Sequence, residues 1–370
     1  RHERRRRADG VHVLIESLTG RVAALARQRP RETAVISLDA AGGRVCDWSR
    51  MWRESRRIAA LLAAAGVPRG EAVAYQTANR AEFVAITLGV LCAGAVCCPL
   101  MPIFRERELR YMLGRARVRV LFVMDRHHER EPVAEVSAIG SQVPSLESVF
   151  VIAADGSDGG GRALPGDGRT RCRWLEAALE ELADETTETA ETVETAQTAQ
   201  TAQTAQTPGA AAAHAEPGAL AQLLFTSGTT GEPKGVLHRA DVLALAARLQ
   251  ADHLGLGAAD RIFVPSPLAH QTGFLYGMWL ALLLGVPQIL QESWEPRLAL
   301  AALGQWRGTF VQAATPFLAD LVQAVEEGEA RPGGLRLFVA TGTTVPRALA
   351  ARARRVLQTD VCGAFGTTEG

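Results

Sequence analysis

The sequence predicts an α/β protein whose sheets are mainly parallel, and three observations lead to this prediction. Helix-like and strand-like segments alternate along most of the 370 residues. The strand-like segments are short apolar runs, as is typical of strands that are covered on both faces. Hydrophobic residues make up 47% of the chain, which is enough for a large core. Strands separated by helices of this length indicate right-handed crossovers between parallel strands.

A first set of alternating elements fills the N-terminal third of the chain. Apolar residues recur at helical spacing in its first long helix, and its last strand is a β-branched run of the buried type. The expected elements, in order, are a strand at Ala34–Leu38, a helix at Trp48–Ala65, a strand at Glu71–Tyr75, a helix at Ala81–Ala93, a strand at Ala95–Leu100, a charged surface helix at Arg105–Arg115 and a strand at Val118–Met124.

A second set follows in the C-terminal part, with helices between its strands. The expected strands are Gln222–Thr226, Arg261–Pro265, Thr309–Gln312, Arg336–Ala340 and Asp360–Ala364.

Two apolar stretches, 83–100 and 274–290, have the hydropathy of membrane spans but not the continuity. Each is interrupted by a glycine and then by a proline. A spanning helix needs about 20 continuous apolar residues. We therefore expect a buried helix followed by a strand in both places, and no membrane span.

The region between the two sets has a different composition. Residues 185–207 contain only Glu, Thr, Ala, Gln and Val, and end in a Thr-Ala-Gln triplet repeat. A period of three matches neither the helix nor the strand period, so this segment cannot present one apolar face for burial. We therefore expect a flexible insertion. The expected organisation is a disordered N-terminal end at 1–10, a first αβ subdomain at 11–184, the insertion at 185–217 and a second αβ subdomain at 218–370.

Charge and cysteine usage exclude several classes of protein. The 40 basic and 40 acidic residues balance, so the chain has no general attraction for nucleic acid or anionic lipid. The six cysteines form no C-x-x-C pair, which argues against a zinc ribbon or a secreted disulfide framework. The basic N-terminal end leads into no apolar signal core. We expect a reduced, cytoplasmic protein and, since the chain lacks an initiating Met, a fragment.

The strongest chemical signal surrounds the only lysine of the chain. Of the 40 basic residues 39 are Arg, and the exception is Lys234. It ends the run Leu-Leu-Phe-Thr-Ser-Gly-Thr-Thr-Gly-Glu-Pro-Lys-Gly at 223–235, where an apolar strand passes into a loop of glycines and hydroxyls. Such loops cradle polyphosphates with backbone N–H groups, hydroxyls and an ammonium. The common P-loop needs Gly before Lys and Ser or Thr after it, and neither is present.

This loop resembles the phosphate-binding signature of adenylate-forming enzymes, a group that includes acyl-CoA synthetases, peptide-synthetase adenylation domains and luciferases. Residues 226–235 match the signature Ser/Thr-Ser/Thr-Gly-Thr-Thr-Gly-x-Pro-Lys-Gly at every position. Four further segments resemble family motifs in the family's order, namely Asn79–Phe83, Leu91–Leu100, Pro267–Gly273 and Phe365–Gly370. The resemblance implies two stacked αβ subdomains of the family's N-terminal domain.

The resemblance also implies residue roles. Thr226, Ser227, Gly228, Thr229, Thr230, Gly231 and Lys234 would hold ATP phosphates, and Gly342, Thr343 and Thr344 would line the adenine and acyl pocket. Phe365, Gly366 and Thr367 would adjoin the adenine, Thr368 would bond the α-phosphate, and Glu369 would hold Mg²⁺, which prefers oxygen ligands. His270 would gate the carboxylate site. At 341 and 344 the family commonly has Gly and Pro where this chain has Thr.

The implied reaction joins a carboxylic acid to ATP, giving an acyl-adenylate and pyrophosphate, and then passes the acyl group to coenzyme A. The family's second lysine comes from a C-terminal lid, and these residues contain neither, so we expect the 370 residues alone to bind nucleotide with little ligase activity. Two alternatives remain open. One is an adenylation domain that loads a carrier protein, and the other is a non-catalytic nucleotide-binding protein. The run at 271–277 resembles ligases for medium or alicyclic acids.

Overall fold

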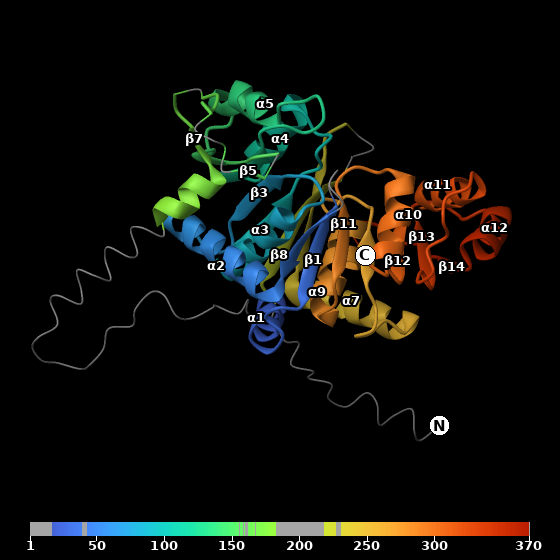
Figure 1. Cartoon of the computed structure of the whole chain (residues 1–370). Coiled ribbons are helices and arrows are strands. Elements are labelled where there is room, and N and C mark those ends of the chain that lie inside the picture. The colour runs from blue at the N-terminus through green and yellow to red at the C-terminus, as the bar shows by residue number, and fades with distance from the viewer. Residues whose placement is uncertain are drawn as a thin grey trace, which may run out of the picture.

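The computed structural model describes residues 17–38, 43–154, 156–157, 159, 162–166, 168–182, 218–226 and 231–369. These residues form two seven-stranded sheets with helices between and outside them (Figure 1). The insertion expected at 185–217 and the disordered end expected at 1–10 lie outside the described residues.

The first sheet, sheet A, has the strand order β14-β13-β12-β10-β11-β1-β2. All its neighbours pair in parallel except β1 and β2, which are antiparallel. Its strands are β1 (Thr33–Leu38), β2 (Arg44–Asp47), β10 (Ile262–Val264), β11 (Gln288–Gln291), β12 (Phe310–Ala314), β13 (Leu337–Thr341) and β14 (Asp360–Gly363).

The second sheet, sheet B, has the order β7-β6-β5-β3-β4-β8-β9. Here too the pairs are parallel except the last, β8 with β9. Its strands are β3 (Ala72–Gln76), β4 (Val96–Pro99), β5 (Val120–Met124), β6 (Ser148–Ile152), β7 (Arg171–Trp174), β8 (Leu220–Thr226) and β9 (Lys234–Arg239). The prediction of an α/β fold with mainly parallel sheets is confirmed.

The two sheets exchange strands across the boundary that we expected at 185–217. β1 and β2 belong to the N-terminal part of the chain but complete sheet A beside β11. β8 and β9 belong to the C-terminal part but complete sheet B beside β4. A linear division into 11–184 and 218–370 therefore does not follow the sheets. Strand pairing is a long-range property that local patterns do not reveal.

Three clusters of buried apolar side chains give the molecule five layers. The central cluster joins the facing sides of both sheets to α1 (Leu18–Gln28), α2 (Trp48–Ala64), α3 (Ala81–Cys92), α7 (Ala240–Leu254) and the helical run α8 (Gln271–Gly273), η2 (Phe274–Trp279) and α9 (Leu280–Leu284). The outer face of sheet A is covered by α10 (Pro296–Gln305), α11 (Thr315–Glu326) and α12 (Arg347–Leu357). The outer face of sheet B is covered by α4 (Glu106–Arg115) and α5 (Pro132–Ile139), which η1 (Gly140–Gln142) follows.

The expected strands are all present, within two residues at either end. The apolar stretch 83–100 is α3 followed by β4, and 274–290 contains η2, α9 and most of β11. Gly94 and Gly285 have φ of +72° and +70°, so these glycines adopt the left-handed conformation that ends a helix. Within the described residues, no helix combines the length and hydropathy that crossing a membrane requires.

Candidate functional site

The segment that carries the only lysine is a β-hairpin at the edge of sheet B. β8 pairs antiparallel with β9 over six residue pairs, from Leu220 opposite Arg239 to Thr226 opposite Lys234. The hairpin thus places Thr226 and Lys234 side by side where the strands enter the loop. Lys234 is exposed and makes no ion pair within the described part of the chain. Its ammonium is available to a ligand at the loop.

The loop between these strands is only partly described. Ser227, Gly228, Thr229 and Thr230 lie outside the described residues. Gly231 has φ of +107°, a conformation that a residue with a side chain rarely adopts, and a Cβ there would meet nothing within 4 Å. The glycine is therefore required by the turn and leaves its backbone open to an approaching group.

The C-terminal segment 364–369 reaches the same hairpin. Burial lowers the pKa of the His238 imidazole on β9, while a hydrogen bond with the backbone of Thr368 and the charge of Glu369 act in the opposite direction. Two motifs that stand more than 130 residues apart in sequence are thus neighbours in space. The carboxylate of Glu369 is exposed, as a residue that binds a ligand from solvent would be.

Phe365 begins this segment and is the most exposed large apolar side chain of the described residues, at 98%. The backbone N–H of the preceding Ala364 donates to the carbonyl of Ala340, 2.9 Å away, so the segment leaves sheet A beside β13. A Cβ on Gly366 would meet nothing within 4 Å. An open aromatic ring next to an unobstructed backbone offers a face for a planar ligand to stack on.

Residues 342–344 leave β13 at the same edge of sheet A, because β13 and β14 are parallel. Gly342 has φ of +81°. The hydroxyl of Thr343 donates to the Thr315 hydroxyl, at 3.1 Å, which anchors the turn to the first residue of α11. Thr344 is exposed. The carboxyl ends of parallel strands are where α/β sheets bind ligands, so the position suits a pocket wall.

His270 lies in the turn between β10 and α8. Its Nδ1 accepts a hydrogen bond from the backbone N–H of Thr272, at 3.3 Å, which orients the ring. Desolvation lowers the pKa of the imidazole, so it is neutral at pH 7. The buried helix expected after this turn begins as a π-helix over Phe274–Trp279. Such turns are rare and are often found at functional sites.

Asn79 holds the segment that leads to His270, a role that the sequence did not reveal. The side chain is buried, and its Nδ2 donates to the carbonyls of Val264 and Ser266, at 3.3 and 2.9 Å. Its Oδ1 accepts from the N–H of Leu268, at 2.7 Å. An amide directly after a buried strand, inside the Asn79–Phe83 motif, was the available signal. One side chain at the end of β3 thus ties sheet B to the turn after β10.

A cavity of about 400 Å³ lies beside Asn79, among segments that leave strands of both sheets. Burial raises the pKa of the Glu292 carboxyl in its wall. His127, which follows β5, also lines the cavity. Burial together with the charges of His128 and Arg130 lowers the pKa of His127 to about 4. The remaining lining residues are Ala78, Met101, Pro102, Ile103, Arg105, Pro265, Pro267, Trp294 and Phe317.

The described residues thus bring the Thr368–Glu369 segment to His238 on β9, the strand that Lys234 begins. They also place 342–344 and 365–367 on one edge of sheet A. No hydrogen bond joins His270 to these groups within the described residues, and its bond with Thr272 is local.

This arrangement places a hairpin with an exposed lysine and a segment with an exposed aromatic ring where two α/β layers meet. The model of the AMP-binding enzyme family matches residues 22–370, so the chain belongs to that family.

Among curated proteins, the chain is similar to the medium-chain fatty-acid–CoA ligase of Escherichia coli, at 29% identity over 88% of this chain and 51% of that protein. It is also similar to the salicyl-AMP ligase / salicyl-S-ArCP synthetase of Mycobacterium tuberculosis, at 27% identity over 93% and 55%. Among solved structures it resembles the anthranilate CoA ligase AuaEII bound to anthranoyl-AMP, with a TM-score of 0.76, 22% identity, and 95% and 60% coverage. The chain spans about half the length of these curated relatives.

Proposed function

We propose that this protein activates a carboxylic acid with ATP and transfers the acyl group to the thiol of coenzyme A. The observation that carries the proposal is the meeting of two distant motifs, the Lys234 hairpin and the Thr368–Glu369 segment, in a member of the AMP-binding family. The CoA ligases among its relatives support the acceptor.

The first step needs positioning more than acid–base chemistry. A carboxylate is already ionised at pH 7, so it needs no base. Its oxygen attacks the α-phosphorus of ATP, and the bond from that phosphorus to the oxygen bridging to the β-phosphate breaks, releasing pyrophosphate. Lys234 and the loop N–H groups offset the charge that develops on the leaving group, and Thr368 orients the α-phosphate. The neutral His270 can lie over the carboxylate site without adding a charge.

Glu369 is the residue that we assign to Mg²⁺. Within the described residues, no three His, Cys, Asp or Glu side chains gather to hold a metal by themselves. This fits Mg²⁺, which nucleotide sites hold by one or two carboxylates together with phosphate oxygens. When bound, the ion would neutralise part of the phosphate charge.

A carrier-protein thiol is the second candidate acceptor. It is favoured by the similarity to a relative whose name includes a salicyl-S-ArCP synthetase. We rank coenzyme A first because the run at 271–277, which begins at α8, resembles ligases for medium or alicyclic acids. Cytoplasmic location is part of the proposal, since all six cysteines carry free thiols.

Two measurements test the proposal. Calorimetric titration of the 370-residue chain with ATP and Mg²⁺ should show binding to one site, and Lys234→Ala should weaken it. Pyrophosphate exchange over a panel of acids, run on the full-length gene product, identifies the acid, and thioester formation from that acid with coenzyme A or a carrier protein identifies the thiol. A chain that binds no nucleotide, or a full-length product that exchanges pyrophosphate with no acid, contradicts the proposal.

A further inference from the structure

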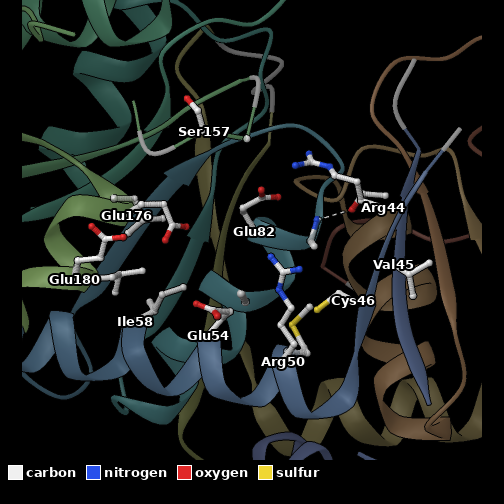
Figure 2. Close-up of a pocket in the computed structure, with 17 residues that line it drawn as sticks. Arg44, Val45, Cys46, Arg50, Glu54, Ile58, Glu82, Ser157, Glu176 and Glu180 are labelled. Atoms are coloured by element: carbon white, nitrogen blue, oxygen red, sulfur yellow. Dashed lines mark hydrogen bonds between the residues drawn. The ribbon is translucent and has the colours of Figure 1, made fainter. Parts of the chain in front are cut away.

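A second cavity, of about 340 Å³, lies apart from the nucleotide site (Figure 2). It opens between β2 at the edge of sheet A, α2, the first turn of α3, residues 156–157 and the helix at 175–182. None of its lining residues belongs to the Lys234 hairpin or to the segments 341–345 and 364–369. Its volume lies at the lower end of the range for small-molecule pockets, about 300–1,000 Å³. The nucleotide chemistry leaves this cavity without a role.

The floor of the cavity is apolar. Met51 and Ile58 of α2, Ala85 of α3, and Leu175 and Leu179 of the opposite helix all line it, and all five are buried. These residues come from three helices and leave a gap that the cores on either side do not fill. An aliphatic chain placed there would remove its surface from water against existing apolar walls.

One wall of the cavity is acidic. Glu176 and Glu180 lie four residues apart on the helix at 175–182, so they share a face, and Figure 2 shows both on the same side of the cavity. Glu180 makes no ion pair within the described residues. The ion pair of Glu176 is long, at 4.0 Å to Arg57, whose guanidinium already binds Glu54 at 2.9 Å. Burial and the charge of Glu54 raise the pKa of Glu176.

The other end of the cavity carries charges of both signs. Arg50 projects from α2 into the cavity and lies near Cys46, the pKa of whose thiol it lowers against the larger effect of burial (Figure 2). Arg44 of β2 lines the cavity too, and so do Glu54 and Glu82, whose charges also act on Cys46. Arg50 and Ile58 are two helical turns apart, about 12 Å along the axis.

We propose that this cavity binds a small aliphatic amine. The ammonium lies against Glu176 and Glu180, where it supplies the counter-charge that Glu180 lacks and that Glu176 finds only in Arg57, 4.0 Å away. The chain lies over Ile58 and Leu179, and the far end of the ligand, neutral or anionic, faces Arg50. Aliphatic amines are protonated at pH 7. The site does not depend on the proposed ligase function.

The test is calorimetric titration of the 370-residue chain with three probes of one chain length, at constant ionic strength and pH 7.5. Hexylamine and 6-aminohexanoate should bind, whereas hexanoate should not. A diffuse attraction to acidic side chains would bind hexylamine equally well without Glu176 and Glu180.

Variants locate the site. Glu176→Gln/Glu180→Gln should weaken hexylamine binding by about tenfold or more, the usual effect of losing charge-assisted hydrogen bonds. Glu106→Gln, which removes an exposed carboxylate from α4, is the matched control and should bind as the parent does. Circular dichroism checks that each variant is folded. The proposal is overturned if no amine binds, if hexanoate binds as tightly as hexylamine, or if the double variant retains the parent's affinity. ATP affinity, measured in parallel, should be the same in all these variants.

Discussion

Lys234 is the residue on which the proposed nucleotide site depends most. It stands opposite Thr226 at the mouth of the hairpin loop and is exposed. We expect Lys234→Ala to weaken ATP binding by about 10- to 100-fold, because a charge-assisted contact is lost. Lys234→Arg should recover only part of this affinity, since a planar guanidinium does not replace a compact ammonium at a phosphate. Titration calorimetry of the three proteins measures the difference.

The control for this prediction is a second cation on the same strand. Arg239→Gln removes one positive charge from the end of β9 that is remote from the loop, where Arg239 pairs with Asp241. It should leave ATP affinity within about twofold of the parent. Equal weakening by both variants would mean that net charge, and not the position of Lys234, holds the phosphates.

His127 gives the molecule a pH dependence of known sign. Burial and the charges of His128 and Arg130 lower its pKa to about 4 in the folded chain, against about 6.5 in the unfolded chain. Between these values the unfolded state binds more protons. The free energy of unfolding should therefore fall as the pH falls from about 6.5 to 4, by about 2 kcal/mol after allowance for solvent screening.

Urea unfolding of the chain at pH 4, 5, 6 and 7 measures this dependence. His127→Gln should reduce the slope over that range, while His253→Gln, which changes an exposed histidine on α7, should retain it. An unchanged slope in His127→Gln would assign the pH dependence to other groups.

At the scale of elements, the turn between β10 and α8 depends on a side chain from the other sheet. Asn79 makes three hydrogen bonds to residues 264–268. We expect Asn79→Ala to cost about 2–3 kcal/mol of unfolding free energy, since buried backbone groups lose their partners. The amides of Leu268 and His270 should also exchange hydrogen faster, because they lie in the released turn.

Hydrogen exchange followed by mass spectrometry separates this positioning role from a general loss of stability. Thr359→Val removes a buried hydroxyl that donates to the Leu335 carbonyl near β13 and β14, and serves as the control. It should lower the unfolding free energy without faster exchange at 264–270 under native conditions. If the two variants give the same exchange pattern, Asn79 does not position the turn specifically.

The sequence predicted most of the strands that are buried on both faces, such as β5, but it missed β6, which is buried at all five positions. Of the four edge strands it predicted β14 and missed β2, β7 and β9. β2 and β9 are edge strands with Arg and Lys in exposed positions, so their composition does not distinguish them from loops. The π-helix at 274–279 has no local signature, because it is set by packing: a Cβ on Gly277 would lie 2.7 Å from Val264 of β10.

The candidate site was also predicted only in part. Residues 226–235 were identifiable because the glycines, hydroxyls and lysine that can bind phosphate lie in one continuous segment. The role of Asn79 was not identifiable, because its three partners lie at 264–268, about 185 residues later. Glu176 and Glu180 belong to a cavity whose other walls come from α2, α3 and β2, and only the fold brings these elements together.

At the scale of the whole molecule, the exchange of strands between the sheets makes the two parts of the chain depend on each other. β1 lies between β2 and β11, so residues 17–182 alone would lack the partner that pairs with β1 from Val35 to Leu38. Residues 218–369 alone would carry β8 and β9 without β4. The central core also draws side chains from both parts.

We therefore expect neither part to fold by itself, although the composition at 185–217 suggests a natural place to divide the chain. Expressed separately, 17–182 and 218–369 should show no cooperative thermal transition by circular dichroism. Expressed together, they should associate and recover one transition, because every strand then has its neighbour. The whole chain is the reference, and a chain cleaved once within 185–217 is the control, since it keeps both parts in one complex. A cooperative transition of 218–369 alone, close to that of the whole chain, would show that sheet A is complete without β1 and β2 and would contradict this prediction.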